Sequence, residues 1–210
     1  MLEPLMHSVL SHQKIILASG SPRRKEILQQ LGLKFNVAVS EFDENLDPST
    51  YRNHGEYAID TASHKVKEVS ERLALEKLEN DLIIGADTIV SLNGKILEKP
   101  KDAVEAVSML KELSGKQHTV FTGVCLKKGN EYVAFAEKTL VTVAQLPVAV
   151  IESYVASGEP MDKAGGYGIQ GKGGSLIEKI DGDYFNVMGL PLHHLCREIL
   201  KLYKFNGPVA

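Results

Sequence analysis

The chain has 210 residues, 43% of them apolar and 24% charged, which is typical of a soluble globular protein with a large core. Its formal net charge of -3 argues against a protein that coats nucleic acid, so any attraction for an anion must be local. Two cysteines, Cys125 and Cys196, are too few for a disulfide framework and favour a reducing compartment. The sequence has neither a signal-peptide pattern nor a segment suited to cross a membrane, so we expect a cytoplasmic protein without membrane contact.

The first half of the chain predicts alternating strands and helices. After an N-terminal extension, residues 1–13, we expect a strand, a helix, a second strand, a polar loop and a long helix, at Lys14–Ala18, Ser21–Gly32, Lys34–Val39, Ser40–Gly55 and about Glu56–Leu78.

The second half begins with a strand and hairpin that turns at Asn93-Gly94. A helix, two long strands, a further helix, a glycine-rich loop, a short hairpin and a last helix are then expected at Lys101–Gly115, His118–Leu146, Pro147–Gly158, about 162–174, Ser175–Val187 and from about Pro191. Hairpins and crossover helices in one chain indicate an α/β protein with a mixed sheet, which we expect to form one domain over residues 14–210.

The stretch LASGSPRRKEIL, Leu17–Leu28, places two arginines at the start of a helix, where the helix dipole is already positive. Free backbone N–H groups, the hydroxyls of Ser19 and Ser21, and the guanidinium groups of Arg23 and Arg24 together match the donors that bind phosphate. A helix cap followed by exposed arginines would explain the serine and the proline but would leave the arginines misplaced. We therefore predict a polyphosphate site here.

A second candidate is the carboxylate of Asp87, which an apolar strand, LIIGA, delivers at its end. Ligands in α/β sheets bind beyond the carboxyl ends of strands, which favours a functional role. An aspartate that caps a turn is the simpler alternative, but the next residues continue as an apolar strand.

These motifs resemble the Maf family of nucleoside triphosphate pyrophosphatases, relatives in fold of the inosine triphosphatase-like enzymes. SGSPRR is similar to the family signature, and further blocks follow in the family's order: GADTIV, LEKPKD, LSGKQHTVFTG, GEPMDKAGGYGIQGKGG and GDYFNVMGLPL. The resemblance covers about Lys14–Tyr203. It implies an elongated mixed sheet flanked by helices, with two lobes and an active-site cleft between them.

The resemblance also implies the chemistry. It makes Asp87 the catalytic carboxylate, which either takes a proton from the attacking water or holds a metal ion that orients the water. Glu44 and Glu98 match acidic family positions, and carboxylates without clustered His or Cys suit Mg2+ or Mn2+ as cofactor. Lys65 and Lys99 match family lysines that assist on the phosphates, although each would otherwise read as an exposed lysine.

Three positions, Arg23, Thr88 and Gln170, resemble the branch of the family that hydrolyses dTTP and UTP. The amide of Gln170 can both donate and accept hydrogen bonds, which suits the imide edge of a pyrimidine. The surrounding GYGIQG also satisfies the dinucleotide fingerprint, but it lacks the preceding strand and following helix, so we reject a Rossmann site. Family members are commonly homodimers, and we expect the same here.

The remaining candidates favour structural roles. On the last helix we expect one of His193 and His194 to pack and the other to be solvated, and we find no set of partners for zinc. Tyr184 and Phe185 are expected to be core residues of the short hairpin. Two rival functions stay open: a phosphatase that releases inorganic phosphate, and a non-catalytic nucleotide-binding domain of a larger protein.

Overall fold

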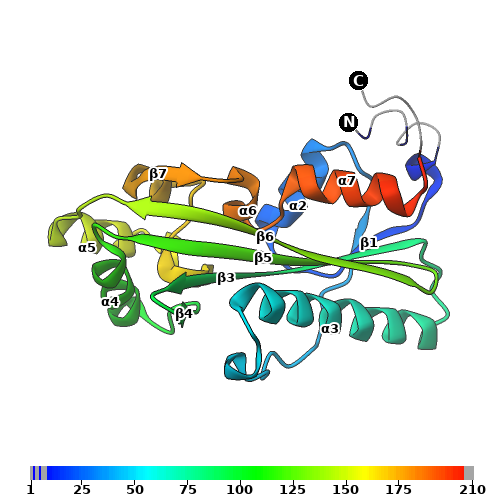
Figure 1. The fold of residues 1–210 in the computed structure, drawn as a ribbon, viewed down its shortest axis with the longest axis horizontal. Coiled ribbons are helices and arrows are strands. Elements are labelled where there is room, and N and C mark those ends of the chain that lie inside the picture. The colour runs from blue at the N-terminus through cyan, green and yellow to red at the C-terminus, as the bar shows by residue number, and fades with distance from the viewer. Residues whose placement is uncertain (1, 3–4, 6–8, 206–210) are drawn as a thin grey trace.

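The protein forms a long mixed sheet with helices on both faces (Figure 1). In this computed structural model the described residues are Leu2, Leu5 and 9–205. The strands are β1 (Ile15–Leu17), β2 (Asn36–Val37), β3 (Leu82–Leu92), β4 (Lys95–Leu97), β5 (Gln117–Lys128), β6 (Glu131–Val143) and β7 (Ile177–Asp181). The α-helices are α2 (Pro22–Gln30), α3 (His54–Leu75), α4 (Ala103–Leu113), α5 (Val148–Ala156), α6 (Tyr184–Met188) and α7 (Leu192–Leu202). Short 3-10 turns occupy Leu10–His12, Pro48–Thr50, Glu159–Asp162, Ala164–Gly166 and Gly171–Leu176.

The strands lie in the order β2-β1-β3-β5-β6-β7, and β4 pairs with the outer part of β3. β1 runs parallel to both β2 and β3, whereas the other neighbours are antiparallel. The long β5–β6 hairpin spans the molecule and joins its two ends (Figure 1). The predicted mixed α/β sheet is thereby confirmed.

Helix α3 covers one face of the sheet, and α2, α6 and α7 lie on the other (Figure 1). Close packing of α3 depends on glycine. A Cβ added at Gly123 on β5 would lie 2.2 Å from the carbonyl carbon of Ala58. A Cβ at Gly85 on β3 would lie 2.4 Å from a methyl carbon of Val66. Because neither glycine has a side chain, the helix rests directly on the strands.

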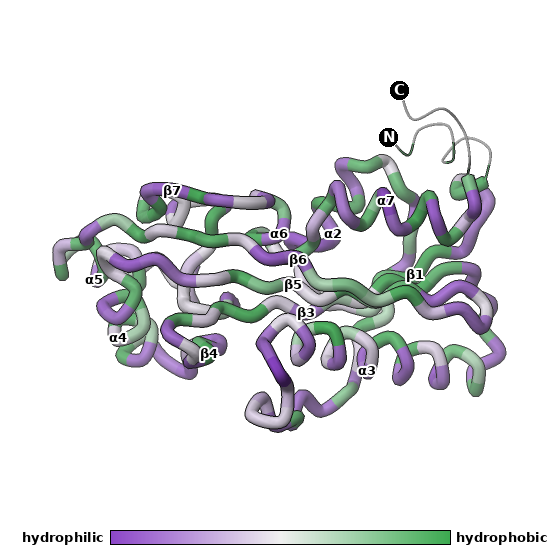
Figure 2. Tube along the Cα trace, viewed as in Figure 1, coloured by the Kyte–Doolittle hydropathy of each residue, from purple (hydrophilic) through white to green (hydrophobic). Residues whose placement is uncertain are grey.

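The two largest apolar clusters lie at the two ends of the sheet, and two smaller clusters lie between α3 and the strands. One cluster joins β1, α2 and α7 with the near half of the β5–β6 hairpin, and the other joins the far half with α4 and α5. Figure 2 shows mostly apolar residues along the central strands, while α3 and α7 alternate between apolar and polar residues. The division produces the two predicted lobes, and it leaves room for a cleft between them.

Most of the predicted elements are confirmed, with three corrections. Ser175–Val187 is not a hairpin, because Asp183 accepts a hydrogen bond from the backbone N–H of Asn186 and starts the helix α6. Asp87 lies in the middle of β3 rather than at the end of a strand. The helix predicted at Pro147–Gly158 begins at Val148, because Pro147 is its N-cap.

Leu2, Leu5 and Leu10 bury their side chains in the core cluster next to α7. This part of the predicted N-terminal extension therefore contributes to packing. Within the described residues, no helix combines the length and the apolar character needed to cross a membrane.

Candidate active site

A cleft of about 580 Å³ opens between the two lobes. Ligand sites typically occupy about 300–1,000 Å³, so the cleft can hold a ligand of nucleotide size. Every predicted site residue except Gln170 lines it: Ser19, Ser21, Arg23, Arg24, Glu44, Lys65, Asp87, Thr88, Glu98 and Lys99. Among the described residues, five cationic side chains and four carboxylates line this cleft of an acidic chain. The lining thus carries an excess of one positive charge, in contrast to the acidic chain as a whole.

The stretch Ser19–Arg24 and the carboxylate of Asp87 line the same cleft because β1 pairs with β3. The strands are parallel, and Leu17, the last residue of β1, pairs with Ile84. Beyond this point the chain leaves the sheet through Ala18 and Ser19, while β3 continues through Asp87. Asp87 thus emerges where its parallel neighbour ends, which is the edge at which α/β proteins bind ligands.

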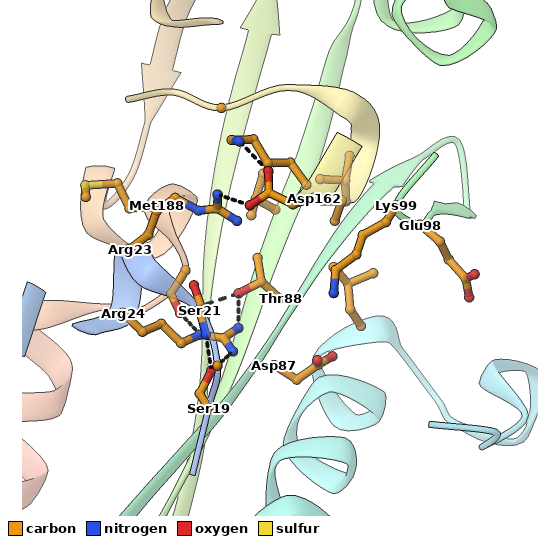
Figure 3. Close-up of a pocket in the computed structure, with 18 of the residues that line it drawn as sticks. Ser19, Ser21, Arg23, Arg24, Asp87, Thr88, Glu98, Lys99, Asp162 and Met188 are labelled. Carbon is orange, nitrogen blue, oxygen red and sulfur yellow. Dashed lines mark hydrogen bonds and ion pairs between the residues drawn. The ribbon is translucent and has the colours of Figure 1, made fainter. Parts of the chain in front are cut away.

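The N-terminus of α2 faces the cleft without a side-chain cap. Ser21 occupies the N-cap position, but its hydroxyl makes no capping hydrogen bond, unlike the caps of α3, α4 and α6. Pro22 needs no hydrogen-bond partner, and the following first-turn N–H groups have none within a helix. Figure 3 shows Ser21 directed into the cleft beside Arg23 and Thr88. The end of α2 is therefore available to an anion.

Arg24 is 9% exposed, and its guanidinium group makes three hydrogen bonds inside the protein. It donates to the carbonyl of Gly189 at 2.8 Å, to Ser19 Oγ at 2.9 Å and to Thr88 Oγ1 at 2.9 Å (Figure 3). Burial lowers the pKa of Arg24, and the negative charge of Asp87 partly opposes this effect. Arg24 thus holds the first loop against β3 and contributes a positive charge from behind the cleft wall.

Lys65 joins two of the predicted acidic residues. Its ammonium nitrogen lies 2.8 Å from Asp87 Oδ1 and 2.9 Å from Glu44 Oε1. The side chains of Lys65 and Asp87 are 11% and 14% exposed, whereas that of Glu44 is 49% exposed. One cation from α3 therefore orients a largely buried carboxylate at the cleft floor.

Glu98 and Lys99 follow β4 and line the opposite side of the cleft. In Figure 3 the ammonium group of Lys99 points inward on the side of Asp87, whereas the carboxylate of Glu98 points away from Asp87. Over the described residues, no three acidic, histidine or cysteine side chains gather into a metal-binding group. Glu44 and Asp87 are brought together, and Glu98 is not brought to them.

The glycine-rich segment, defined here as residues 163–173, forms the upper wall of the cleft. Arg23 Nη1 lies 3.2 Å from Asp162 Oδ2, just before this segment (Figure 3). Burial alone would raise the pKa of Asp162, but the hydrogen bond from Lys163 and the charge of Arg23 lower it. An ion pair thus links the stretch predicted to bind phosphate to the opposite wall.

Gln170 lies outside the cleft lining. Its Nε2 donates to both carboxylate oxygens of Glu26 on α2, each at 2.9 Å. The side chain that sequence reasoning assigned to base recognition therefore forms a second link between α2 and the glycine-rich segment. No motif in the sequence pointed to Glu26.

Other candidates occupy structural positions, as expected. His194 stacks on Phe135 and lies 2.7 Å from Glu137 Oε2, while His193 is exposed. Cys125 and Cys196 are buried free thiols. In α6, Phe185 packs against the core but Tyr184 is 41% exposed, so the expectation of two core aromatics holds only for Phe185.

Sequence reasoning also missed Tyr57, which lines the cleft from α3, and Asn186, which is buried. Asn186 Nδ2 donates to the carbonyl of Val120 and to Thr139 Oγ1. These bonds fix α6 to the sheet beside Gly189. A single asparagine in a five-residue helix carries no pattern that reveals such a role.

Comparison with known proteins connects this site to a family. The family model described as "Maf-like protein" matches residues 14–202. A human "probable bifunctional dTTP/UTP pyrophosphatase/methyltransferase protein" is 48% identical over 92% of this chain, which spans only 33% of that protein. The "dTTP/UTP pyrophosphatase" of Bacillus cytotoxicus is 46% identical, with 89% of this chain and 94% of the relative covered. That of Symbiobacterium thermophilum is 46% identical, with 94% of this chain and 96% of the relative covered.

Among solved structures, the Staphylococcus aureus Ham1 protein aligns with 91% of this chain and 98% of its own, with 15% identity and a TM-score of 0.46. A likeness of this size supports no conclusion about function.

Proposed function

The chain belongs to the Maf family, and from this premise we propose that it hydrolyses nucleoside triphosphates to the monophosphate and diphosphate. Its proposed substrates are dTTP and UTP, including modified pyrimidine nucleotides. The observation that supports this most is the position of Asp87: it lies with Lys65 on the floor of the cleft, facing an uncapped helix N-terminus and two arginines. The names of the relatives, which cover nearly the whole chain, agree with this activity.

In the proposed mechanism, the triphosphate binds along the first loop. Ser19, Ser21 and the first-turn N–H groups of α2 donate to phosphate oxygens, while Arg23 exchanges its partner Asp162 for a phosphate. Arg24 supports this loop and neutralises charge from within the wall. Lys65 and Lys99 approach the phosphates from the other side of the cleft.

Asp87 then accepts a proton from the water that attacks the α-phosphorus. The P–O bond to the bridging oxygen breaks, diphosphate leaves, and the nucleoside monophosphate retains the oxygen of the water. Lys65 keeps the Asp87 carboxylate oriented through their 2.8 Å contact. A general base contributes typically 10²–10⁴-fold, so this residue should dominate the loss of activity on mutation.

The donor set also fits a hard divalent cation. Mg2+ is usually held by one or two carboxylates together with substrate phosphates, and Asp87 and Glu44 supply two such groups. Glu98 would complete the set after turning into the cleft. A bound Mg2+ or Mn2+ would neutralise charge on the phosphates and on the leaving diphosphate.

Removal of divalent cations should therefore stop hydrolysis. We expect EDTA to abolish diphosphate release from UTP, and excess Mg2+ or Mn2+ to restore it, because carboxylates bind both ions. Calcium is added in a parallel reaction as the control, because it saturates EDTA without supplying Mg2+ or Mn2+. Persistent turnover after exhaustive chelation and dialysis would contradict the proposed metal dependence.

The upper part of the cleft suits the base. Its lining includes Val90, Leu97, Val120 and Tyr167, which belong to the apolar core cluster of the far lobe. The phosphate donors lie at the other end, near Ser19 and Arg24 (Figure 3). A nucleotide bound in this direction would place its base against the glycine-rich segment. The preference for pyrimidines would be set by Arg23, Thr88 and Gln170, of which Thr88 lies at the phosphate end beside Arg24.

A product assay tests this function. Purified protein is incubated with UTP, dTTP, CTP, ATP and GTP, and diphosphate and orthophosphate are measured separately. We expect diphosphate from UTP and dTTP, with little discrimination at the 5-methyl group or the 2′-hydroxyl. Release of orthophosphate instead would favour the phosphatase alternative, and binding without turnover would favour a non-catalytic nucleotide-binding domain. A preference for purine triphosphates would overturn only the assignment to the family branch that hydrolyses dTTP and UTP, and the proposed release of diphosphate would stand.

We further propose a cytoplasmic homodimer with one catalytic domain over residues 14–210. The acidic net charge and the two buried thiols support a reducing compartment and the absence of a nucleic-acid partner.

A further inference from the structure

His118 and Tyr167 form a buried hydrogen bond behind the cleft wall. His118 on β5 is 2% exposed and Tyr167 in the glycine-rich segment is 6% exposed. The Nε2 atom of His118 lies 2.7 Å from the hydroxyl of Tyr167, and the two rings meet edge to face at 5.3 Å. The bond therefore connects the central sheet directly to the cleft wall.

The two partners are both neutral, and their hydrogen bond is isolated. Burial lowers the pKa of His118 to about 4 and raises the pKa of Tyr167. The other ring nitrogen of His118, Nδ1, has no hydrogen-bond partner within the described chain. The contact that the structure shows for this ring is therefore the one that joins β5 to the glycine-rich segment through Tyr167.

The glycine-rich segment contains two short 3-10 turns, at Ala164–Gly166 and from Gly171, but no α-helix or strand that would hold its shape. Gly165, Gly166 and Gly171 all have positive φ angles. The two ends of the segment are fixed: the N–H of Gly165 donates to the carbonyl of Glu98, and Glu159 accepts from the N–H groups of Lys172 and Gly173. Tyr167 lies between these attachments.

The position of Tyr167 also determines where its neighbours meet the cleft. Gly168 and Ile169 line the cleft directly after it, and Gly168 N–H donates to the hydroxyl of Tyr154 at 3.0 Å. A Cβ at Gly165 would lie 2.9 Å from Val90, so the backbone before Tyr167 rests directly on β3. A small movement of the Tyr167 ring would therefore move the wall that faces the base.

We propose that His118 is a positioning residue for nucleobase recognition: its hydrogen bond to Tyr167 holds the glycine-rich wall at the distance from β3 that a pyrimidine requires. This inference rests on the proposed function. His118 does not line the cleft, and it acts through Tyr167.

The test compares Tyr167→Phe, His118→Phe and the double variant. Each single variant leaves one buried polar group unpaired and should lower thermal stability, whereas the double variant replaces both partners by apolar rings and should regain it. Loss of the bond should raise KM for UTP about 2–10-fold and leave kcat within about 2-fold, because Asp87 and Lys65 lie outside the segment. The ratio of kcat/KM for UTP to that for ATP should fall by a similar factor.

The double variant separates positioning from stability. We expect its KM and base selectivity to remain impaired although its stability recovers. If KM and selectivity recover together with stability, or if all three variants keep the wild-type values, the proposal is wrong. The selectivity ratio does not depend on the folded fraction. Tyr203→Phe, which loses a comparable bond to Gln13 far from the cleft, is the matched control and should keep both values.

Amide hydrogen exchange gives a readout that does not depend on activity. In the ligand-free protein, the N–H groups of Gly165 and Gly168 should exchange faster in the Tyr167→Phe and double variants than in the wild type or Tyr203→Phe. Unchanged exchange would overturn the positioning role. If wild-type protein hydrolyses no nucleoside triphosphate, the proposed function fails, and the exchange result still decides whether the bond holds the segment.

Discussion

Asp87 owes its chemical role to the groups around its carboxylate. The side chain is 14% exposed and shares the ammonium group of Lys65 with Glu44, which keeps one oxygen fixed and leaves the other free to face the cleft. A neutral amide at this position would keep the size of the side chain but could neither take a proton nor balance Lys65.

We predict that Asp87→Asn folds normally and loses about 100-fold or more in kcat for UTP, since a general base contributes typically 10²–10⁴-fold. Steady-state diphosphate release measures the loss, and circular dichroism checks the fold. Asp81→Asn is the matched control, because Asp81 directly precedes the same strand and accepts a hydrogen bond from Lys14 N–H outside the cleft. A folded Asp87→Asn protein with near-normal kcat would show that Asp87 is not the base.

Gln170 illustrates how a side chain can affect specificity without lining the cleft. Its amide bonds to both oxygens of Glu26, and Arg23, one turn earlier on α2, pairs with Asp162. These two bridges connect α2 to the wall of the cleft at separate points. A change at Gln170 therefore acts on two elements at once.

Gln170→Glu should place a carboxylate against Glu26 and push the two elements apart. We predict that the preference for UTP over ATP falls by about fivefold, the equivalent of roughly 1 kcal/mol of lost interaction. The ratio of the two kcat/KM values measures it. The double variant Glu26→Gln/Gln170→Glu, which exchanges the two side chains, restores an amide–carboxylate contact and should recover the preference for UTP. If the exchanged pair does not recover it, Gln170 contacts the base directly.

At the level of elements, α3 must lie close to the sheet for Lys65 to reach Asp87. Gly123 and Gly85 make this approach possible at two points along the helix. At Gly123 the added Cβ would meet backbone atoms of Ala58, whereas at Gly85 it would meet the side chain of Val66. The two sites therefore differ in how a clash could be relieved.

We predict that Gly123→Ala destabilises the protein by about 1–3 kcal/mol or more, because overpacking against backbone forces the helix to move. Urea denaturation monitored by circular dichroism measures the change. Gly85→Ala should be destabilising too, but Val66→Ala should partly rescue it because the clashing methyl groups are removed. No side-chain truncation on α3 should rescue Gly123→Ala, and a stable Gly123→Ala protein would contradict the packing argument.

For the whole molecule, the buried His118 couples folding to pH. The pKa of its ring is about 4 in the folded protein because burial disfavours the charged form, against 6.5 for an exposed histidine. Between these values the unfolded chain binds more protons, so stability rises with pH through this window and is lost as pH falls towards 4.

We predict that this single group contributes roughly 3 kcal/mol to the loss of stability on acidification from pH 7 to pH 4. Urea denaturation at a series of pH values measures the slope for the wild type and for His118→Phe. The variant should lose stability less steeply across the window, whatever its stability at pH 7. Equal slopes would mean that His118 is not held neutral in the folded state.

The sequence alone determined most of the elements, and every predicted site residue except Gln170 lines the cleft. The spacing of apolar residues, the capping residues and the turn glycines are local signals. They made β1, α2, the β3–β4 turn, α4 and the β5–β6 hairpin predictable. The proposed phosphate donors are likewise gathered in one short stretch, Ser19–Arg24, and Asp87 follows a recognisable apolar run. Local signals failed in Ser175–Val187, where the Asp183 cap outweighs the strand pattern.

Tertiary structure alone decided what each side chain contacts. Arg24 turns into the protein because Ser19, Thr88 and the carbonyl of Gly189 meet there. Gln170 binds Glu26, 144 residues away along the chain, and His118 reaches Tyr167 across 49 residues. Such contacts depend on how the two lobes pack on one sheet, and the burial of His118 cannot be read from any local pattern.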